Sequence, residues 1–166
     1  MYRKIEDFQK DWAYETEQTI KLFRHLTDES LNRKVTETGR SLGFLAWHLA
    51  QTLGEMLEKV GLRIDAPALD APTPAAAGEI ADAFEKAALS VAAEVAANWS
   101  DETLFEEENL YGETWKRGQT LLYLMLHQAH HRGQMTVLMR QAGLPVVGIY
   151  GPAKEEWQAM GMPALA

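Results

Sequence analysis

Apolar residues recur along most of this chain at steps of three and four, the spacing that lines one face of an α-helix. In residues 5–26 the repeating positions include Ile5, Phe8, Trp12, Ile20 and Phe23. In residues 42–60 they are Leu45, Leu49, Leu53, Met56, Leu57 and Val60. No segment shows a convincing strand pattern. The chain is therefore predicted to be all-α, with each helix burying one face against the others.

Two further helices follow, each bounded by residues that start or stop a helix. An alanine-rich segment is expected to begin at Thr73 and Pro74, a capping hydroxyl followed by a residue that has no N–H to satisfy, and to run to about Trp99. Another is expected over residues 118–142, where Gly143 ends it. Four long helices are thus predicted.

The segments between these helices complete the predicted architecture. The connections after the first and second helices are long enough to cross a bundle, and the proline-rich stretch 65–74 must be a loop. Residues 100–113 form a polar, acidic connection, and a short helix is expected over residues 153–160. We predict a four-helix bundle with long crossover connections and a short C-terminal helix, in a single domain over residues 1–166.

Charge and composition exclude several classes of function. The formal net charge is -8 and the basic residues are scattered, which disfavours binding to nucleic acid or to an anionic membrane. No apolar run approaches the length of about 20 residues that spans a bilayer, and the N-terminal segment lacks the apolar stretch of a secretory signal. A cytoplasmic protein is expected. With no cysteine, thiolate metal ligands and a protein-borne thiol nucleophile are excluded.

Three of the five histidines lie within residues 127–131, on the fourth predicted helix. His127 and His131 are four positions apart, so both imidazoles can reach one metal ion. A pair formed by His127 and His130 is also geometrically possible. His131 is preferred because it continues the stripe formed by Thr120, Leu124, His127, Gln128, Met135 and Leu138. Packed, hydrogen-bonded histidines are the alternative interpretation.

His48 strengthens the metal hypothesis, because it lies within the apolar stripe of the second helix. A packed neighbouring helix could bring it to His127 and His131. The metalloprotease motif is excluded, since Gln128 stands where that motif has its glutamate base. Three neutral imidazoles would leave an ion its full charge and an open position, which suits catalysis. His25, near the end of the first helix, is interpreted as a C-terminal helix cation.

Other polar and aromatic residues have competing interpretations. Gln134 could position a ligand or could be an ordinary polar helix residue. Arg132 is expected to form a salt bridge or an interface, although it could also offset the acidity near a bound thiolate. Glu55 is interpreted as a solvated helix residue, with a fourth ligand or a base as the alternative. Trp47, Trp115 and Tyr150 are expected in the core or in a pocket wall.

Four motifs stand out: the run HQAHHRGQM at 127–135, AGLP at 142–145, YGP at 150–152 and SLGFLAWHLA at 41–50. In these motifs the chain resembles the DinB-like (YfiT-like) metal-binding family. The resemblance implies a four-helix bundle, often dimeric, with a three-histidine site for zinc or nickel. His48, His127 and His131 match its ligand positions. It also implies activities such as transfer of low-molecular-weight thiols, bacillithiol among them.

Three functions remain open at this point, and no catalytic residue is assigned. The favoured hypothesis is a transferase in which the metal binds a low-molecular-weight thiol cosubstrate and presents a thiolate to a small-molecule electrophile. This route needs no protein base. The alternatives are a metal-dependent hydrolase and a noncatalytic metal- or ligand-binding stress protein. A homodimer is expected, because Leu122, Met125, Leu126 and Ala129 lie largely away from the histidine stripe. Another helix of the same chain could cover them instead.

Overall fold

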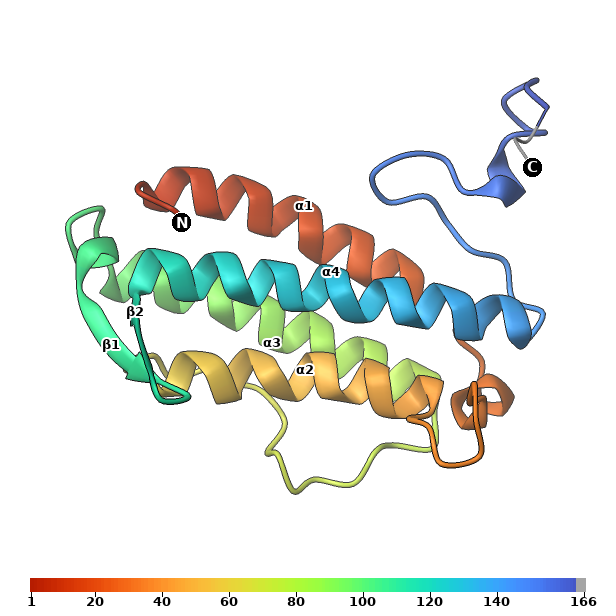
Figure 1. The fold of residues 1–166 in the computed structure, drawn as a ribbon, viewed down its shortest axis with the longest axis horizontal. Coiled ribbons are helices and arrows are strands. Elements are labelled where there is room, and N and C mark those ends of the chain that lie inside the picture. Colours follow the sequence, from red (N-terminus) through yellow and green to blue (C-terminus); the bar gives the residue numbers. More distant parts are fainter. Residues whose placement is uncertain (164–166) are drawn as a thin grey trace.

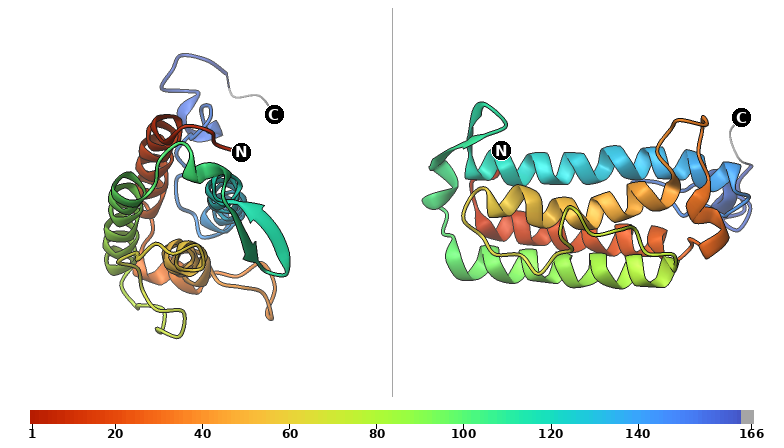
Figure 2. Two further views of the ribbon diagram at one scale, coloured as in Figure 1. Left: turned by 90° about the vertical axis from the view of Figure 1, so that its left-hand side faces the viewer. Right: turned by 90° about the horizontal axis from the view of Figure 1, so that it is seen from below.

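Four long helices, packed side by side, make up most of the molecule (Figure 1). The computed structural model describes residues 1–163 and places the helices at α1 (Ile5–Phe23), α2 (Leu42–Glu58), α3 (Ala77–Asn98) and α4 (Arg117–Gln141). Both α1 and α2 pack against α3 and α4, so the end view in Figure 2 shows α1 diagonally opposite α2. The predicted all-α, four-helix bundle is confirmed.

The predicted apolar faces meet in one continuous core. Its fully buried side chains include Phe8, Trp12, Leu22, Leu49, Leu53, Ile80, Phe84, Leu121 and Leu124. The indole of Trp12 donates a hydrogen bond to the Ala88 carbonyl oxygen at 2.9 Å, so the polar atom of this buried ring is satisfied across α1 and α3. Within residues 1–163 no helix is both long enough and apolar enough to cross a membrane.

The direction of the helices explains the long connections. In Figure 1, α1 and α4 run one way and α2 and α3 run the other. Residues 24–41 cross one end of the bundle, whereas residues 59–76 return along its length (Figure 1). Side chains of α2 hold this returning segment: Gln51 donates to the Ala68 carbonyl at 2.6 Å, and Trp47 donates to the Ala71 carbonyl at 3.0 Å. Trp47 is therefore a structural residue.

The third helix begins later than predicted. It starts at Ala77 rather than at Pro74, and its N-cap residue makes no side-chain hydrogen bond. The Ala77 N–H instead donates to the carboxylate of Asp28 at 2.7 Å. Asp28 belongs to the 3-10 turn η1 (Asp28–Asn32), which follows α1. A carboxylate distant in sequence thus accepts a hydrogen bond from one of the free N–H groups at the start of α3. The predicted start at Thr73 and Pro74 is wrong.

A β-hairpin lies in the connection where no strand was predicted. Strands β1 (Glu107–Leu110) and β2 (Glu113–Lys116) pair antiparallel. Tyr111 and Gly112 join them with φ angles of 55° and 83°. Two successive positive φ values are those of a type I′ turn, whose twist matches that of the strands. The strands are short and mostly exposed, so no alternating apolar pattern marked them.

The C-terminal segment also differs from the prediction. The helix expected over residues 153–160 is reduced to one 3-10 turn, η3 (Lys154–Glu156), followed by further turns. One carboxylate oxygen of Glu156 accepts hydrogen bonds from the N–H groups of Ala153 and Gly148, at 2.7 and 2.9 Å. These bonds close the turn locally, and they satisfy the backbone without a longer helix.

Candidate metal centre

Three imidazoles converge where α2 and α4 pack against each other. His48 comes from α2, and His127 and His131 come from successive turns of α4. The Nε2 atom of His127 lies 3.3 Å from that of His48 and 3.1 Å from that of His131. Each of the three residues offers a ring nitrogen within 4.8 Å of the other two. The structure therefore brings together the three histidines that the sequence singled out.

These distances fit a bound divalent ion. Zn–N bonds of about 2.0–2.1 Å at tetrahedral angles place neighbouring nitrogens about 3.3 Å apart. The observed nitrogen separations of 3.3 and 3.1 Å are close to that value. Packing alone does not explain polar ring atoms gathered in this way.

The surroundings of the three imidazoles favour the neutral form, which is the form that binds metal. Burial, reinforced by His131 and His48, lowers the pKa of His127 to about 4. Burial also lowers the pKa of His48, and a proton on the neighbouring His131 would lower it further. For His131, burial lowers the pKa and the hydrogen bond to Gln134 partly opposes it. At neutral pH no proton competes with an ion for the lone pairs that meet here.

Gln134 sets the orientation of His131. Its side-chain oxygen lies 2.8 Å from Nδ1 of His131, so Nδ1 carries the proton and Nε2 keeps a lone pair. The amide nitrogen of Gln134 then donates to Nε2 of His130, 3.1 Å away. His130 is exposed and outside the cluster, which favours the pair of His127 and His131 over the pair of His127 and His130. Of the two interpretations of Gln134, the positioning role agrees with this geometry.

Replacing Gln134 with leucine is expected to weaken metal binding by about tenfold, the effect typical of a lost partner to a ligating histidine. Without its acceptor, His131 no longer has a fixed tautomer. Chelator competition on the purified protein measures the change. Thr136→Val, two residues further along α4 and hydrogen-bonded only to the Gly133 carbonyl of the same helix, is the matched control. Equal affinity in the Gln134 variant and the wild type would contradict the orienting role.

Charged groups flank the imidazoles on two sides, and the sequence did not point to the first of them. Arg40 lies over the Phe44 ring, 5.0 Å from its centroid, and that ring stacks on His48 at 5.9 Å and 12°. Arg40, Phe44 and His48 follow one another at intervals of four residues. This spacing is the only feature of the sequence that could have indicated that Arg40 and Phe44 lie near the cluster. On the other side, Glu55 accepts a hydrogen bond from Tyr111 at 2.5 Å and pairs with Lys59 at 3.2 Å. Glu55 is therefore engaged rather than simply solvated.

Arg132 faces away from the histidine cluster. It is buried and forms an ion pair with Glu15 of α1, and it also donates to the Thr19 hydroxyl at 2.8 Å. Tyr150 donates to both carboxylate oxygens of Glu15 at 2.8 and 2.9 Å, and burial raises the pKa of this tyrosine to about 12. The expected salt bridge is present. Arg132 cannot offset the charge of a bound thiolate, because it is occupied on the opposite side of α4.

Aromatic residues of the hairpin pack against the first half of α4. Trp115 packs edge-on against Tyr123, with ring centroids 4.6 Å apart, one turn before His127 on α4. Tyr111 packs against the other side of Trp115 at 5.7 Å. The hairpin thus packs its aromatic residues against the start of α4, and Trp115, partly buried, packs against the hydrophobic core.

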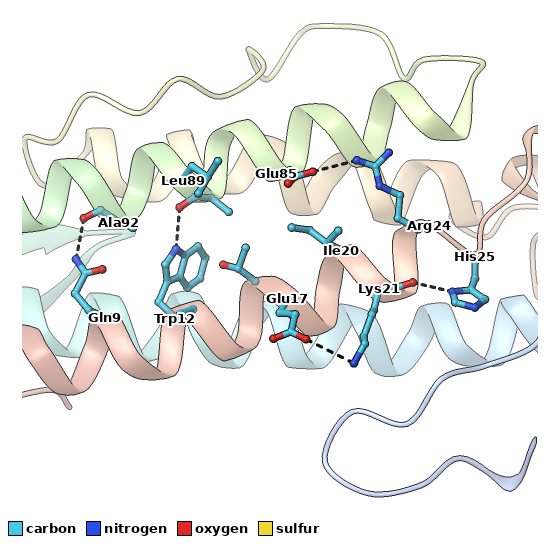
Figure 3. A pocket seen from close by; sticks show the side chains of 13 residues that line it. Gln9, Trp12, Glu17, Ile20, Lys21, Arg24, His25, Glu85, Leu89 and Ala92 are labelled. Atoms are coloured by element: carbon cyan, nitrogen blue, oxygen red, sulfur yellow. Dashed lines mark hydrogen bonds and ion pairs between the residues drawn. The ribbon is translucent and has the colours of Figure 1, made fainter. Parts of the chain in front are cut away.

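A separate groove lies between α1 and α3, away from the histidine cluster (Figure 3). Trp12, Ile20 and Leu89 form its apolar wall, and its charged groups are paired with one another. His25 lies at its end, where Nδ1 is 2.8 Å from the Lys21 carbonyl oxygen (Figure 3). This contact with the last turn of α1 agrees with the interpretation of His25 as a helix-terminal residue.

Comparison with known proteins adds two findings of high coverage. A family model described as the DinB family matches residues 1–163. An uncharacterised protein of Bacillus subtilis (strain 168), YrdA, is 44% identical over 164 residues, which cover 99% of this chain and 98% of YrdA. Both matches span the helices that carry the histidine cluster.

Solved structures agree with the fold. A DinB-like protein from Bacillus cereus superposes with a TM-score of 0.87 at 40% identity, covering 90% of this chain and 100% of that one. A second DinB-like protein, YjoA from Bacillus subtilis, gives a TM-score of 0.68 at 15% identity over 89% of this chain and 99% of its own. The second similarity shows the fold alone.

Proposed function

Because this chain belongs to the DinB family and brings His48, His127 and His131 to one point, we propose that it binds a divalent metal through these imidazoles. The observation that carries the proposal is the pair of Nε2 separations, 3.3 and 3.1 Å, which match the edge of a tetrahedral site. Zinc and nickel are the proposed ions, since both accept imidazole nitrogen.

We further propose that the protein is a transferase of low-molecular-weight thiols, of the bacillithiol type. A bound divalent ion would supply the deprotonation of a coordinating thiol. The chain's own part is to hold the ion: three imidazoles would bind it, Gln134 orients His131, and Phe44 stacks on His48. Glu55, two turns along α2 from His48, has one carboxylate oxygen on Tyr111 and the other on Lys59. This engagement disfavours Glu55 as a base for a hydrolase and supports the thiol route.

A thiol is expected to bind the metal-loaded protein at least about tenfold more tightly than the metal-free protein, and to release close to one proton at neutral pH. The physical reason is that only the thiolate is a good metal ligand, so binding is coupled to deprotonation. Calorimetry with 2-mercaptoethanol in buffers of different ionisation enthalpy counts the protons, and cobalt substitution reports sulfur ligation by its absorption.

The S-methyl thioether of the same compound is the matched control, because it has no thiol proton to release. Equal binding of 2-mercaptoethanol to loaded and metal-free protein, without proton release, would refute the transferase proposal. An ester and amide hydrolysis panel would then test Glu55 as the base of a hydrolase. If the protein shows neither metal-dependent thiol binding nor hydrolysis, the remaining proposal is a metal-binding protein without catalytic activity.

We also propose a homodimer. Of the four residues that suggested it, Met125 is buried within the bundle, whereas Leu126 is 53% exposed. Neighbouring helices of the same chain thus cover part of this surface, and Leu126 is left for a partner. Sedimentation at micromolar concentration is expected to give twice the chain mass, and Leu126→Glu to lower the dimer fraction. Leu69→Glu, on the returning connection, is the control. A wild-type monomer would contradict the proposal.

A further inference from the structure

The three imidazoles are held in place in different ways. Gln134 orients His131 through a contact of 2.8 Å with its Nδ1 atom. His127 packs between the other two rings, with its centroid 5.1 Å from that of His48 and 4.5 Å from that of His131. For His48, the one hydrogen-bonding contact of the ring within residues 1–163 joins its Nε2 to Nε2 of His127, and Nε2 is the atom proposed to bind the ion. The orientation of the His48 ring therefore depends on packing.

The ring of Phe44 is the stacking partner of His48. The two residues are one turn apart on α2, their ring centroids are 5.9 Å apart, and their planes differ by 12°. Offset stacking at such a separation is favourable beyond the burial of apolar area. The outer torsion of a histidine side chain has a broad preference, so the rotamer alone does not fix the plane of the imidazole. Phe44 is 41% exposed and thus adds little to the core, but its parallel ring fixes this plane.

Phe44 is itself fixed at the start of α2. Ser41 is the N-cap residue of this helix, and its hydroxyl accepts a hydrogen bond from the Phe44 N–H at 3.1 Å. The guanidinium of Arg40 lies 5.0 Å from the centroid of the Phe44 ring, a cation–π contact. Guanidinium, phenyl ring and imidazole therefore form a column that extends from the capped start of the helix to His48.

We infer that Phe44 is the positioning residue of His48. The lone pair of Nε2 lies in the plane of the imidazole, so a ring turned out of this plane would point the lone pair away from Nε2 of His127 and from an ion bound there. By stacking on the imidazole, Phe44 does for His48 what Gln134 does for His131. The inference rests on the proposed metal site and concerns its geometry. Phe44 does not contact the ion, so it has no catalytic role.

Replacing Phe44 with leucine is expected to weaken zinc binding by about fivefold, the effect of one aromatic stack. Leucine keeps the apolar bulk and favours helix, and urea unfolding verifies that the fold is kept. Phe44→Tyr keeps the ring and should bind zinc as tightly as the wild type. Chelator competition measures the affinities. The matched control is Phe105→Leu, which should bind zinc like the wild type. Phe105 is 46% exposed, belongs to the 3-10 turn η2 (Thr103–Phe105) and has its own cation contact, with Lys116 at 6.0 Å.

A double-variant cycle with His48 distinguishes positioning from a general structural effect. Because Phe44 is inferred to act through His48, Phe44→Leu should weaken zinc binding in the wild-type background and should have no further effect in protein that already carries His48→Ala. Equal losses in both backgrounds would overturn the inference. So would wild-type affinity in Phe44→Leu, a failure of Phe44→Tyr to restore affinity, or a similar loss in Phe105→Leu.

Crystal structures of the metal-free protein test the positioning of His48 separately from metal binding. The wild type is expected to show one orientation of the His48 imidazole, and Phe44→Leu to show a ring turned out of that plane or several orientations. If the wild type binds no zinc, cobalt or nickel but the orientation still depends on Phe44, the metal proposal fails and the positioning role stands. An unchanged orientation in Phe44→Leu overturns the positioning role, whether or not the protein binds metal.

Discussion

Replacing His127 with alanine is expected to weaken metal binding by more than about 100-fold, beyond the loss typical of an outer-shell partner. His127 is the central ligand of the proposed site, because its Nε2 lies 3.3 Å from that of His48 and 3.1 Å from that of His131. Its removal leaves two imidazoles on different helices. Elemental analysis of protein purified without chelator should fall from about one ion per chain to a small fraction of that.

His130→Ala is the matched control, since His130 is an exposed neighbour on the same helix. It should keep the metal, whereas His131→Ala should lose it. The opposite result for these two variants would replace His131 by His130 as the ligand. Unchanged metal content in both His127→Ala and His131→Ala would end the metal proposal itself.

Replacing Glu15 with alanine is expected to destabilise the fold by about 3–5 kcal/mol, the cost of leaving one partner of a buried ion pair alone. The Arg132 side chain is only 1% exposed and pairs with Glu15 across α1 and α4. Without the carboxylate, the guanidinium keeps the Thr19 hydroxyl but has no counter-charge. Urea unfolding should show the midpoint fall without a large change in slope.

The double variant Glu15→Leu with Arg132→Met controls for the loss of volume. It removes both charges and keeps apolar bulk at both positions, so it should recover most of the lost stability. A double variant as unstable as Glu15→Ala would show that the surrounding contacts, such as the hydrogen bonds from Tyr150, matter more than the unpaired charge.

The helices could be predicted from the sequence because each carries its signal within its own residues. The repeating apolar positions and the glycine after α4 placed that helix at 118–142, one residue from its observed bounds of Arg117–Gln141. The same phase predicted an inward stripe on α4, and its members Thr120, Leu124, Gln128 and Met135 are indeed buried. His48 could be added because it shares the apolar face of α2. Helical periodicity thus grouped His127 and His131 on one face of α4 and added His48, 79 residues before His127, to the same proposed site.

The features that escaped prediction depend on contacts between distant segments or on exposed residues. The start of α3 is set by Asp28, which lies 49 residues before Ala77. The hairpin strands are mostly exposed, so no apolar alternation marks them, and only Tyr111 and Gly112 at its turn carry a local signal. Arg40 is one of several unremarkable surface arginines until the fold places it beside Phe44 and His48.

If the proposed ion binds, the location of the imidazoles on two helices would also couple the supply of metal to the stability of the folded chain. His48 and His127 are 79 residues apart, so an ion held by both acts as a reversible cross-link between α2 and α4. An unfolded chain separates these ligands and loses the site. Free metal at 100 times the dissociation constant would then add about 2.7 kcal/mol to the free energy of unfolding. During metal starvation the same protein would unfold more often and be degraded faster, so its abundance would follow the metal available.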